Sequence, residues 1–149
     1  MIEIRPVSSK ELAEVWAMEK ELFPDAWSEK ALKDHFDNPF SVCFLCFSDG
    51  IPASYLIASQ MDEEGEILRI GTLPNFRRRG LASRLLTHFF QNGIASGMTR
   101  VFLEVREANR SARGLYESLG FLSIGIRKAY YRFPSDNAVL YQKNLEKDL

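Results

Sequence analysis

Apolar residues recur along the chain with two spacings. A period of two is typical of half-buried strands, and a period near 3.6 is typical of amphipathic helices. Strand patterns occupy residues 1–7, 40–47, 51–61, 67–73, 99–105, 121–133 and 138–145, and helix patterns occupy 12–23, 28–36, 80–96 and 110–119. Tight turns are predicted at 48–50 and 62–66. The order β-α-α-β-β-β-α-β-α-β-β predicts an α/β fold with a mixed sheet, because hairpins come before and after two strand–helix units.

Capping residues support the predicted helix boundaries. Ser8 and Glu11 have the spacing of a capping box before the first helix. Ser28 and Asn109 are expected N-caps of the second and fourth helices, and Gly120 suits the left-handed position after the fourth. The local signals therefore agree with the hydrophobic pattern.

Length and charge narrow the class of protein. The chain has 149 residues, 46% of them hydrophobic, which predicts a single domain over 1–149. No apolar run approaches the roughly 20 residues that span a bilayer, and the N-terminus lacks the pattern of a secretory signal. We therefore expect a cytoplasmic protein without a membrane partner. The net charge of −1 argues against non-specific nucleic-acid binding.

The two cysteines, Cys43 and Cys46, have the spacing of a redox pair. A redox pair normally opens a helix, which lowers the pKa of its first thiol, whereas these lie within an apolar strand pattern. Residues three apart on a strand point to opposite faces, so plain buried thiols are favoured. A zinc site needs about four ligands. Because the two histidines, His35 and His88, lie far away in sequence, no metal is expected.

The stretch "RRRGLAS" at 77–83 places three arginines before a predicted helix. A helix N-terminus has unpaired N–H groups and a partial positive charge, so it binds anions readily. Gly80 lets the backbone approach an anion closely, and the small Ala82 and Ser83 leave the next N–H groups accessible. The features suit a diphosphate. The alternative, a solvated surface loop, stays open on these residues alone, because the loop is neither a dinucleotide fingerprint nor a P-loop.

The same loop resembles the Q/R-x-x-G-x-G/A loop of the GNAT superfamily of acetyltransferases, which holds the pyrophosphate of acetyl-coenzyme A. The segment "FLEVREANRSARGLYESLGF" at 102–121 resembles a segment of the RimI-type enzymes of that superfamily, which acetylate the N-terminal amine of a ribosomal protein. The stretches "FPDAWSEKAL" at 23–32 and "IRKAYYRFPSDNAVLY" at 126–141 resemble further RimI-type segments. The element order is also that of the superfamily.

The resemblance implies a role for particular residues. The strand backbone at Ile70, Gly71 and Thr72 is expected to pair with the pantetheine arm of acetyl-coenzyme A. The residues expected around the pyrophosphate are Arg78, Arg79, Gly80, Leu81, Ala82 and Ser83. Asn109 is expected near the reactive end of the coenzyme, Glu104 matches the family's general base, and Tyr116 matches its general acid.

The chemistry needs both of these last residue types. An amine must lose a proton to attack the thioester, and a carboxylate such as Glu104 can take it, directly or through water. A phenol is protonated at neutral pH, so Tyr116 can donate to the leaving sulfur. From spacing alone, Glu104 could instead be an exposed acid at a strand end and Tyr116 a core tyrosine. Tyr130 and Tyr131 could line an acceptor groove or simply alternate on a strand.

Two positions depart from the RimI-type pattern. Ala82 stands where these enzymes more often have glycine, and Asn137 stands where an acid usually precedes the alanine of the last strand. Because Asn137 lies toward the acceptor side of the fold, the acceptor is less well defined than the coenzyme.

The expected acceptor is a protein N-terminus, such as that of a ribosomal protein with a small first residue. The alternatives are a same-fold enzyme acting on lysine or a small amine, and a non-catalytic module that binds RNA or an acidic partner. The net charge of −1 argues against the last of these. The sequence leaves the oligomeric state open.

Overall fold

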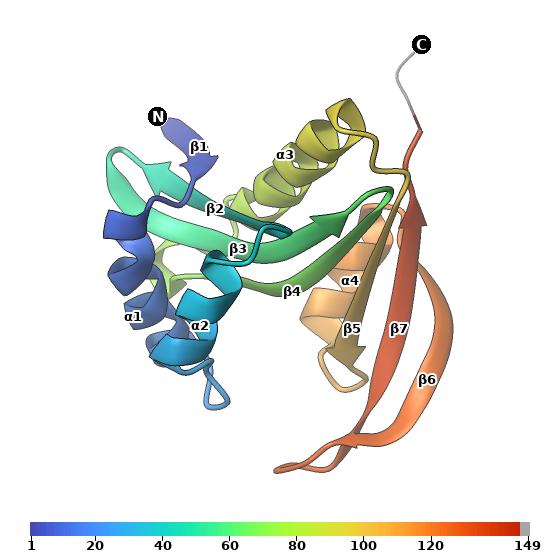
Figure 1. Cartoon of the computed structure of the whole chain (residues 1–149). Helices are drawn as coiled ribbons and strands as arrows, with labels where there is room; N and C mark the ends of the chain where they lie inside the picture. The colour runs from blue at the N-terminus through green and yellow to red at the C-terminus, as the bar shows by residue number, and fades with distance from the viewer. Residues whose placement is uncertain (147–149) are drawn as a thin grey trace.

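The computed structural model describes residues 1–146 and has helices on both faces of one twisted sheet (Figure 1). The strands are β1 (Ile2–Pro6), β2 (Ser41–Ser48), β3 (Ile51–Met61), β4 (Glu64–Thr72), β5 (Arg100–Arg106), β6 (Leu122–Tyr131) and β7 (Asp136–Asn144). The α-helices are α1 (Leu12–Leu22), α2 (Glu29–Phe36), α3 (Leu81–Ala95) and α4 (Arg110–Ser118), and short 3-10 turns lie at Ser9–Glu11 and Pro74–Phe76. The predicted α/β element order is confirmed.

The predicted caps are present. The N–H and the hydroxyl of Ser8 each donate to Glu11 Oε1 at 3.0 Å, which forms the capping box before α1. Ser28 Oγ caps α2 by accepting a hydrogen bond of 3.0 Å from the third residue of the helix. Gly120 has a φ of 92° after α4, in the left-handed region that glycine adopts without strain.

The turn predicted over 62–66 is wrong in extent. β4 already begins at Glu64, which pairs directly with Met61 of β3. The reversal needs only Asp62 and Glu63 because Asp62 adopts a φ of 53°, a conformation that tight hairpins require and aspartate tolerates. Two of the four acidic residues in this run, Glu64 and Glu66, therefore belong to the strand.

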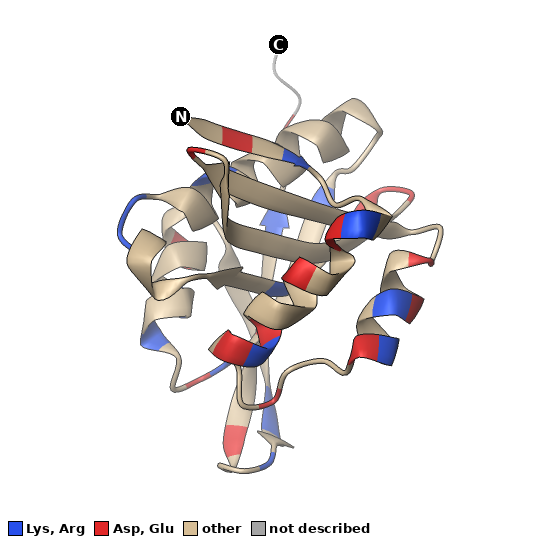
Figure 2. Ribbon diagram, turned by 90° about the vertical axis from the view of Figure 1, so that its left-hand side faces the viewer, with Lys and Arg blue, Asp and Glu red and all other residues tan. Residues whose placement is uncertain are grey.

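The sheet has the order β1-β2-β3-β4-β5-β7-β6, and among the neighbouring strands of residues 1–146 only the pair β4–β5 is parallel. One apolar core, which includes Leu85 and Phe89, lies between the sheet and the helices α3 and α4. A second core, which includes Val15 and Leu32, lies between the sheet and the helices α1 and α2. β2 and β3 lie between the two cores and carry no charged residue, as the tan central strands in Figure 2 show.

The parallel pair β4–β5 separates part-way along. Residues 64–67 of β4 pair with 100–103 of β5, and no pairing between the two strands follows within the described chain. β4 continues beside β3 as far as Thr72, and β5 continues beside β7 as far as Arg106. We call the divergence between residues 68–72 of β4 and 104–106 of β5 the fork; Figure 1 shows the two strands parting there. Backbone groups on the fork side of each strand have no strand partner.

The cysteines are free thiols on opposite faces of β2, as predicted. Cys46 is buried in the core beneath α3, and Cys43 packs against the core beneath α1 and α2. Burial raises the pKa of both thiols, which favours the uncharged form. The histidines serve packing: His35 Nε2 lies 2.9 Å from the Ala58 carbonyl oxygen, and His88 contacts the Phe44 ring edge-on. In the part of the chain that the structure describes, no helix is long and apolar enough to cross a membrane.

Candidate functional site

The β4 side of the fork contains Ile70, Gly71 and Thr72. These residues pair with β3 along one edge, while their other edge faces the fork. Gly71 is also required by packing, because a Cβ atom there would lie 2.8 Å from the Tyr55 ring and 2.9 Å from Leu22 Cδ1. The free edge offers backbone N–H and C=O groups to an extended ligand, which is what a pantetheine arm would need.

The N-terminus of α3 lies just beyond the end of β4. Gly80 is the N-cap, with a φ of 73°. The first intrahelical hydrogen bond runs from the Arg84 N–H to the Gly80 carbonyl at 3.1 Å, so the three preceding N–H groups point out of the helix end. Those groups belong to Leu81, Ala82 and Ser83. Because Leu81 is buried, it can offer an anion only its backbone.

The three arginines before α3 take different positions. Arg77 Nε donates to the Thr72 carbonyl at 3.2 Å and so points back toward β4. The Arg79 guanidinium lies 5.5 Å from the centroid of the Phe76 ring. Arg78 adopts a φ of 63°, in the left-handed region. Their charges add to the positive end of the α3 dipole, and the site fits a diphosphate on both counts.

Glu104 lies on the β5 side of the fork. Its neighbours Leu103 and Val105 point into the core beneath α3 and α4, so Glu104 points to the opposite face of the sheet. Its side chain is 29% exposed, and its Oε1 atom lies 3.2 Å from Arg127 Nε of β6. The carboxylate is therefore held in place while water can still reach it.

Tyr116 lies on α4, on the other face of the sheet. Its ring is buried against Phe121 and Tyr141, with ring centroids 5.7 Å and 6.4 Å away. Its hydroxyl has no hydrogen-bond partner among residues 1–146, yet every buried side-chain oxygen in that part of the chain has one. The hydroxyl is therefore not completely sealed from solvent, although the residue as a whole is buried.

The environment of Tyr116 keeps its phenol protonated. The pKa of Tyr116 is raised to about 12, mainly because the ring is buried and further by charge on Tyr131, while the Arg69 guanidinium acts to lower it. The neutral phenol is the form that can donate a proton or a hydrogen bond.

Tyr131, at the end of β6, packs against an aromatic and a cationic neighbour. Its pKa is raised by burial first and then by the charge of Glu104. It packs edge-on against Tyr130 at 5.1 Å between ring centroids, and the Arg106 guanidinium covers its ring at 4.3 Å. Tyr131 thus has Tyr130 and Arg106 as its direct neighbours.

Asn109 has a structural role in the described chain. Its Oδ1 atom accepts a hydrogen bond of 3.1 Å from the Ala112 N–H and caps α4, as the sequence predicts. This cap fixes the helix that carries Tyr116. The expected contact between Asn109 and the coenzyme stays a prediction.

Comparisons with known proteins agree with this architecture. A model of the acetyltransferase (GNAT) family matches residues 12–121, more than half of the chain. The chain belongs to the GNAT family of acetyltransferases. It is accordingly an acetyl-coenzyme A-dependent N-acetyltransferase.

Individual GNAT relatives match along most of their length. A [ribosomal protein bS18]-alanine N-acetyltransferase from Salmonella typhimurium is 33% identical over 125 residues, which cover 84% of each chain. The N-alpha-acetyltransferase RimI from Mycobacterium tuberculosis is 30% identical over 136 residues, covering 85% of this chain and 82% of that one. The crystal structure of the ribosomal-protein-S18-alanine N-acetyltransferase from Escherichia coli superposes with a TM-score of 0.93 at 26% identity, covering 100% of this chain and 97% of that one.

Two charged residues of this GNAT chain are not indicated by the sequence pattern, one in the paired part of β4 next to the fork and one within the fork. Glu66 lies on β4 opposite Phe102, and its pKa is raised by burial and by the charge of Glu104, while His35 lowers it. The sequence assigned Glu66 to a turn, which hid its place beside Glu104. The second residue is Arg69. In the sequence it is a single charge within a strand pattern, and no local signal indicates that it pairs with the buried Glu19.

Proposed function

We propose that this GNAT enzyme transfers the acetyl group to the N-terminal α-amine of a protein, with a ribosomal protein that has a small first residue as the acceptor. The names of its relatives from S. typhimurium and E. coli support this acceptor class. The observation that carries the proposal is the fork, where the free edge of β4 and the water-accessible Glu104 carboxylate of β5 lie on diverging strands, so that a thioester and a base for an amine can meet there.

The coenzyme would be held along the β4 side of the fork. The N–H groups at the start of α3, with Arg78 and Arg79, would bind its diphosphate, and the free edge of Ile70–Thr72 would bind its pantetheine arm. Asn109 would lie near its reactive end. Acetyl-coenzyme A supplies the activated acetyl thioester. No metal enters the proposal.

The chain's own residues would manage the protons. Glu104 would take a proton from the acceptor amine, directly or through water, so that the amine attacks in its neutral form. Tyr116 would donate to the sulfur that leaves, because its raised pKa keeps the phenol protonated. Such acid and base roles typically contribute about 10²–10⁴-fold to turnover.

An α-amine suits this site for a physical reason. Its pKa is about 7.7–8.0, whereas that of a lysine amine is about 10.4, so a larger share is neutral at physiological pH. A carboxylate base therefore has less work to do. The backbone of the acceptor peptide can also donate and accept hydrogen bonds along a strand-lined opening.

A panel of short peptides tests the acceptor. Each peptide has a free or a blocked N-terminus, with or without an internal lysine, and acetyl transfer is followed by mass spectrometry. Transfer should follow the free N-terminus and favour a first alanine. If blocked peptides with a lysine are the better substrates, the lysine alternative replaces this proposal and the enzyme class stands.

A further inference from the structure

Glu19 of α1 is a fully buried carboxylate with several donors around it. Tyr55 of β3 donates its hydroxyl to Oε1 at 2.6 Å. Arg69 of β4 approaches Oε2 with Nε at 3.0 Å and Nη2 at 2.9 Å. The Trp27 N–H donates to the same oxygen at 3.0 Å. A buried carboxylate without partners costs several kcal/mol, so these contacts hold α1, β3, β4 and the α1–α2 connection in one arrangement.

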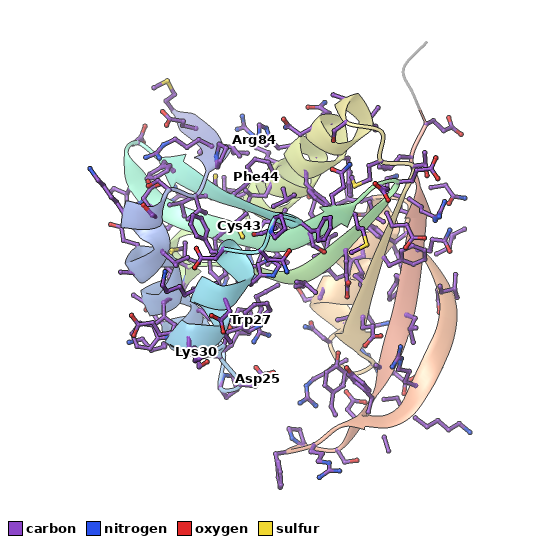
Figure 3. All side chains as sticks on the ribbon, in the orientation of Figure 1. Asp25, Trp27, Lys30, Cys43, Phe44 and Arg84 are labelled. Atoms are coloured by element: carbon purple, nitrogen blue, oxygen red, sulfur yellow. The ribbon has the colours of Figure 1, made fainter. Side chains whose placement is uncertain are left out.

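The connection between α1 and α2, residues 23–28, is anchored to Arg69 in particular. Arg69 Nη2 donates to the Asp25 carbonyl oxygen at 3.0 Å, and the guanidinium lies 4.0 Å from the centroid of the Phe23 ring. A further bond of 3.3 Å joins Trp16 Nε1 to the Trp27 carbonyl. Figure 3 places the labelled Asp25 and Trp27 on this connection. The segment is thus fixed from both sides, although it has no regular secondary structure.

The segment and Arg69 face the fork. Arg69 lies in the part of β4 that β5 no longer pairs. Its charge lowers the pKa of Tyr116, and the charge of Asp25 contributes to the raised pKa of Tyr131. The contacts of Arg69 with Asp25 and Phe23 bring residues 23–28 beside the fork from the side of α1 and α2.

We propose that Arg69 is a positioning residue for the acceptor, because it fixes residues 23–28 as the wall against which the first acceptor residue binds. The inference rests on the proposed function, in which an acceptor N-terminus enters between this segment and Tyr130–Tyr131. Arginine suits the task because the N–H groups of its planar guanidinium reach Glu19 and Asp25 together. A lysine ammonium does not reproduce this geometry.

The main variant is the double substitution Glu19→Gln with Arg69→Met. It removes the link to Asp25 without leaving a buried charge unpaired, and the amide oxygen that replaces the carboxylate can still accept a hydrogen bond from Tyr55 or Trp27. The matched control is Glu64→Gln with Arg100→Met, which removes the ion pair of 2.7 Å at the closed end of β4 and β5. For each enzyme we would measure the KM for acceptor peptide, kcat, coenzyme affinity by calorimetry and the thermal midpoint.

The double variant should raise the acceptor KM about tenfold, because a displaced wall misplaces the acceptor, while coenzyme affinity stays within about twofold. The control should leave both constants unchanged. An unchanged acceptor KM in a folded double variant would overturn the inference, as would an equal loss of acceptor and coenzyme binding. Should the double variant not fold, Arg69→Lys decides: an acceptor KM above that of the wild type supports the inference, and a wild-type value overturns it.

A failure of the proposed function is distinguishable from a failure of the inference about Arg69. The proposed function fails if the wild type transfers only to blocked peptides that contain a lysine. The KM of whichever acceptor the wild type uses then still decides the role of Arg69.

Discussion

The side chain of Asn137 on β7 holds the backbone of Ala129 on β6: its Oδ1 atom accepts a hydrogen bond of 2.8 Å from the Ala129 N–H. Ala129 has a φ of 52°, an unfavourable region for alanine, and it directly precedes Tyr130 and Tyr131. Asn137 Nδ2 also donates to Glu107 Oε1 at 3.3 Å. The residue that departs from the RimI-type pattern thus supports the irregular part of β6 beside the fork.

Asn137→Ala should destabilise the chain by about 1–3 kcal/mol, because the strained Ala129 backbone loses its acceptor. It should also raise the acceptor KM, since the two tyrosines lose their support. Asn137→Asp is the informative comparison: it keeps the acceptor for Ala129 but sets a carboxylate beside Glu107. We expect a smaller KM change for Asp than for Ala in steady-state assays, and equal changes would contradict this account.

Gly80→Val should lower acetyl-coenzyme A affinity by at least about tenfold, because a side chain at the N-cap of α3 crowds the bound anion. Apart from the adjacent backbone, no atom of residues 1–146 lies within 4 Å of a Cβ at this position, so the stability cost is the backbone strain at φ 73°, about 1–2 kcal/mol. Calorimetry measures the affinity. Gly97→Val is the control, since Gly97 has a φ of 95° and equal space but lies at the other end of α3. Equal coenzyme affinities for the two variants would mean that the α3 N-terminus does not bind the coenzyme.

Glu104→Gln should reduce turnover about 10²–10⁴-fold at neutral pH, with coenzyme affinity preserved. Activity should partly recover as pH rises past about 8, because the α-amine then loses its proton unaided. A pH–rate profile of kcat checks this against Glu64→Gln, which changes a carboxylate at the closed end of the same strand pair. If Glu104→Gln kept full activity and its pH–rate profile ran parallel to that of Glu64→Gln, Glu104 would be only a strand-end acid paired with Arg127.

Tyr116→Phe should reduce turnover by a similar factor and leave stability within about 0.5 kcal/mol, because the hydroxyl has no partner to lose in the described chain. Tyr141→Phe should instead lower stability and leave turnover nearly unchanged. Its hydroxyl accepts from Arg113 at 3.0 Å and donates to Glu117 at 2.6 Å, so its loss costs stability of about 1–3 kcal/mol. Single-turnover kinetics and urea unfolding separate the two; full activity in Tyr116→Phe would return this residue to a packing role.

Glu66→Gln should stabilise the chain more at neutral than at acidic pH. Burial and the charge of Glu104 raise the pKa of Glu66, so the folded chain holds this proton more tightly than the unfolded chain does. The tighter proton binding adds to the free energy of unfolding. This stabilisation is present below the unfolded pKa of about 4.3 and is lost as pH rises through the folded pKa of Glu66. The gain in thermal midpoint over the wild type should therefore be larger at about pH 7 than at about pH 4. In a Glu104→Gln background this difference should shrink, and its persistence at full size would exclude Glu104 as a cause.

The sequence by itself determined the order of the elements and the ends of the helices. Hydrophobic periods of two and 3.6 residues and caps such as Ser8 with Glu11 act between neighbours in the chain, so they can be read locally. The coenzyme loop is also local, because Gly80 and the start of α3 are adjacent. Tyr116 and Glu104 could be named only through the resemblance of their segments to a family, since neither residue has a local signal of chemistry.

Only the tertiary structure decided what meets at the fork. The position where β4 leaves β5, between Ile67 and Leu68, depends on strand pairing between segments more than 30 residues apart. The burial of Glu19 and its pairing with Arg69 and Tyr55 depend on helix-to-sheet packing in the same way. A carboxylate on a helix pattern is indistinguishable in sequence from an exposed one. Its environment, and hence its role, is set by side chains that the chain brings together only when the sheet forms.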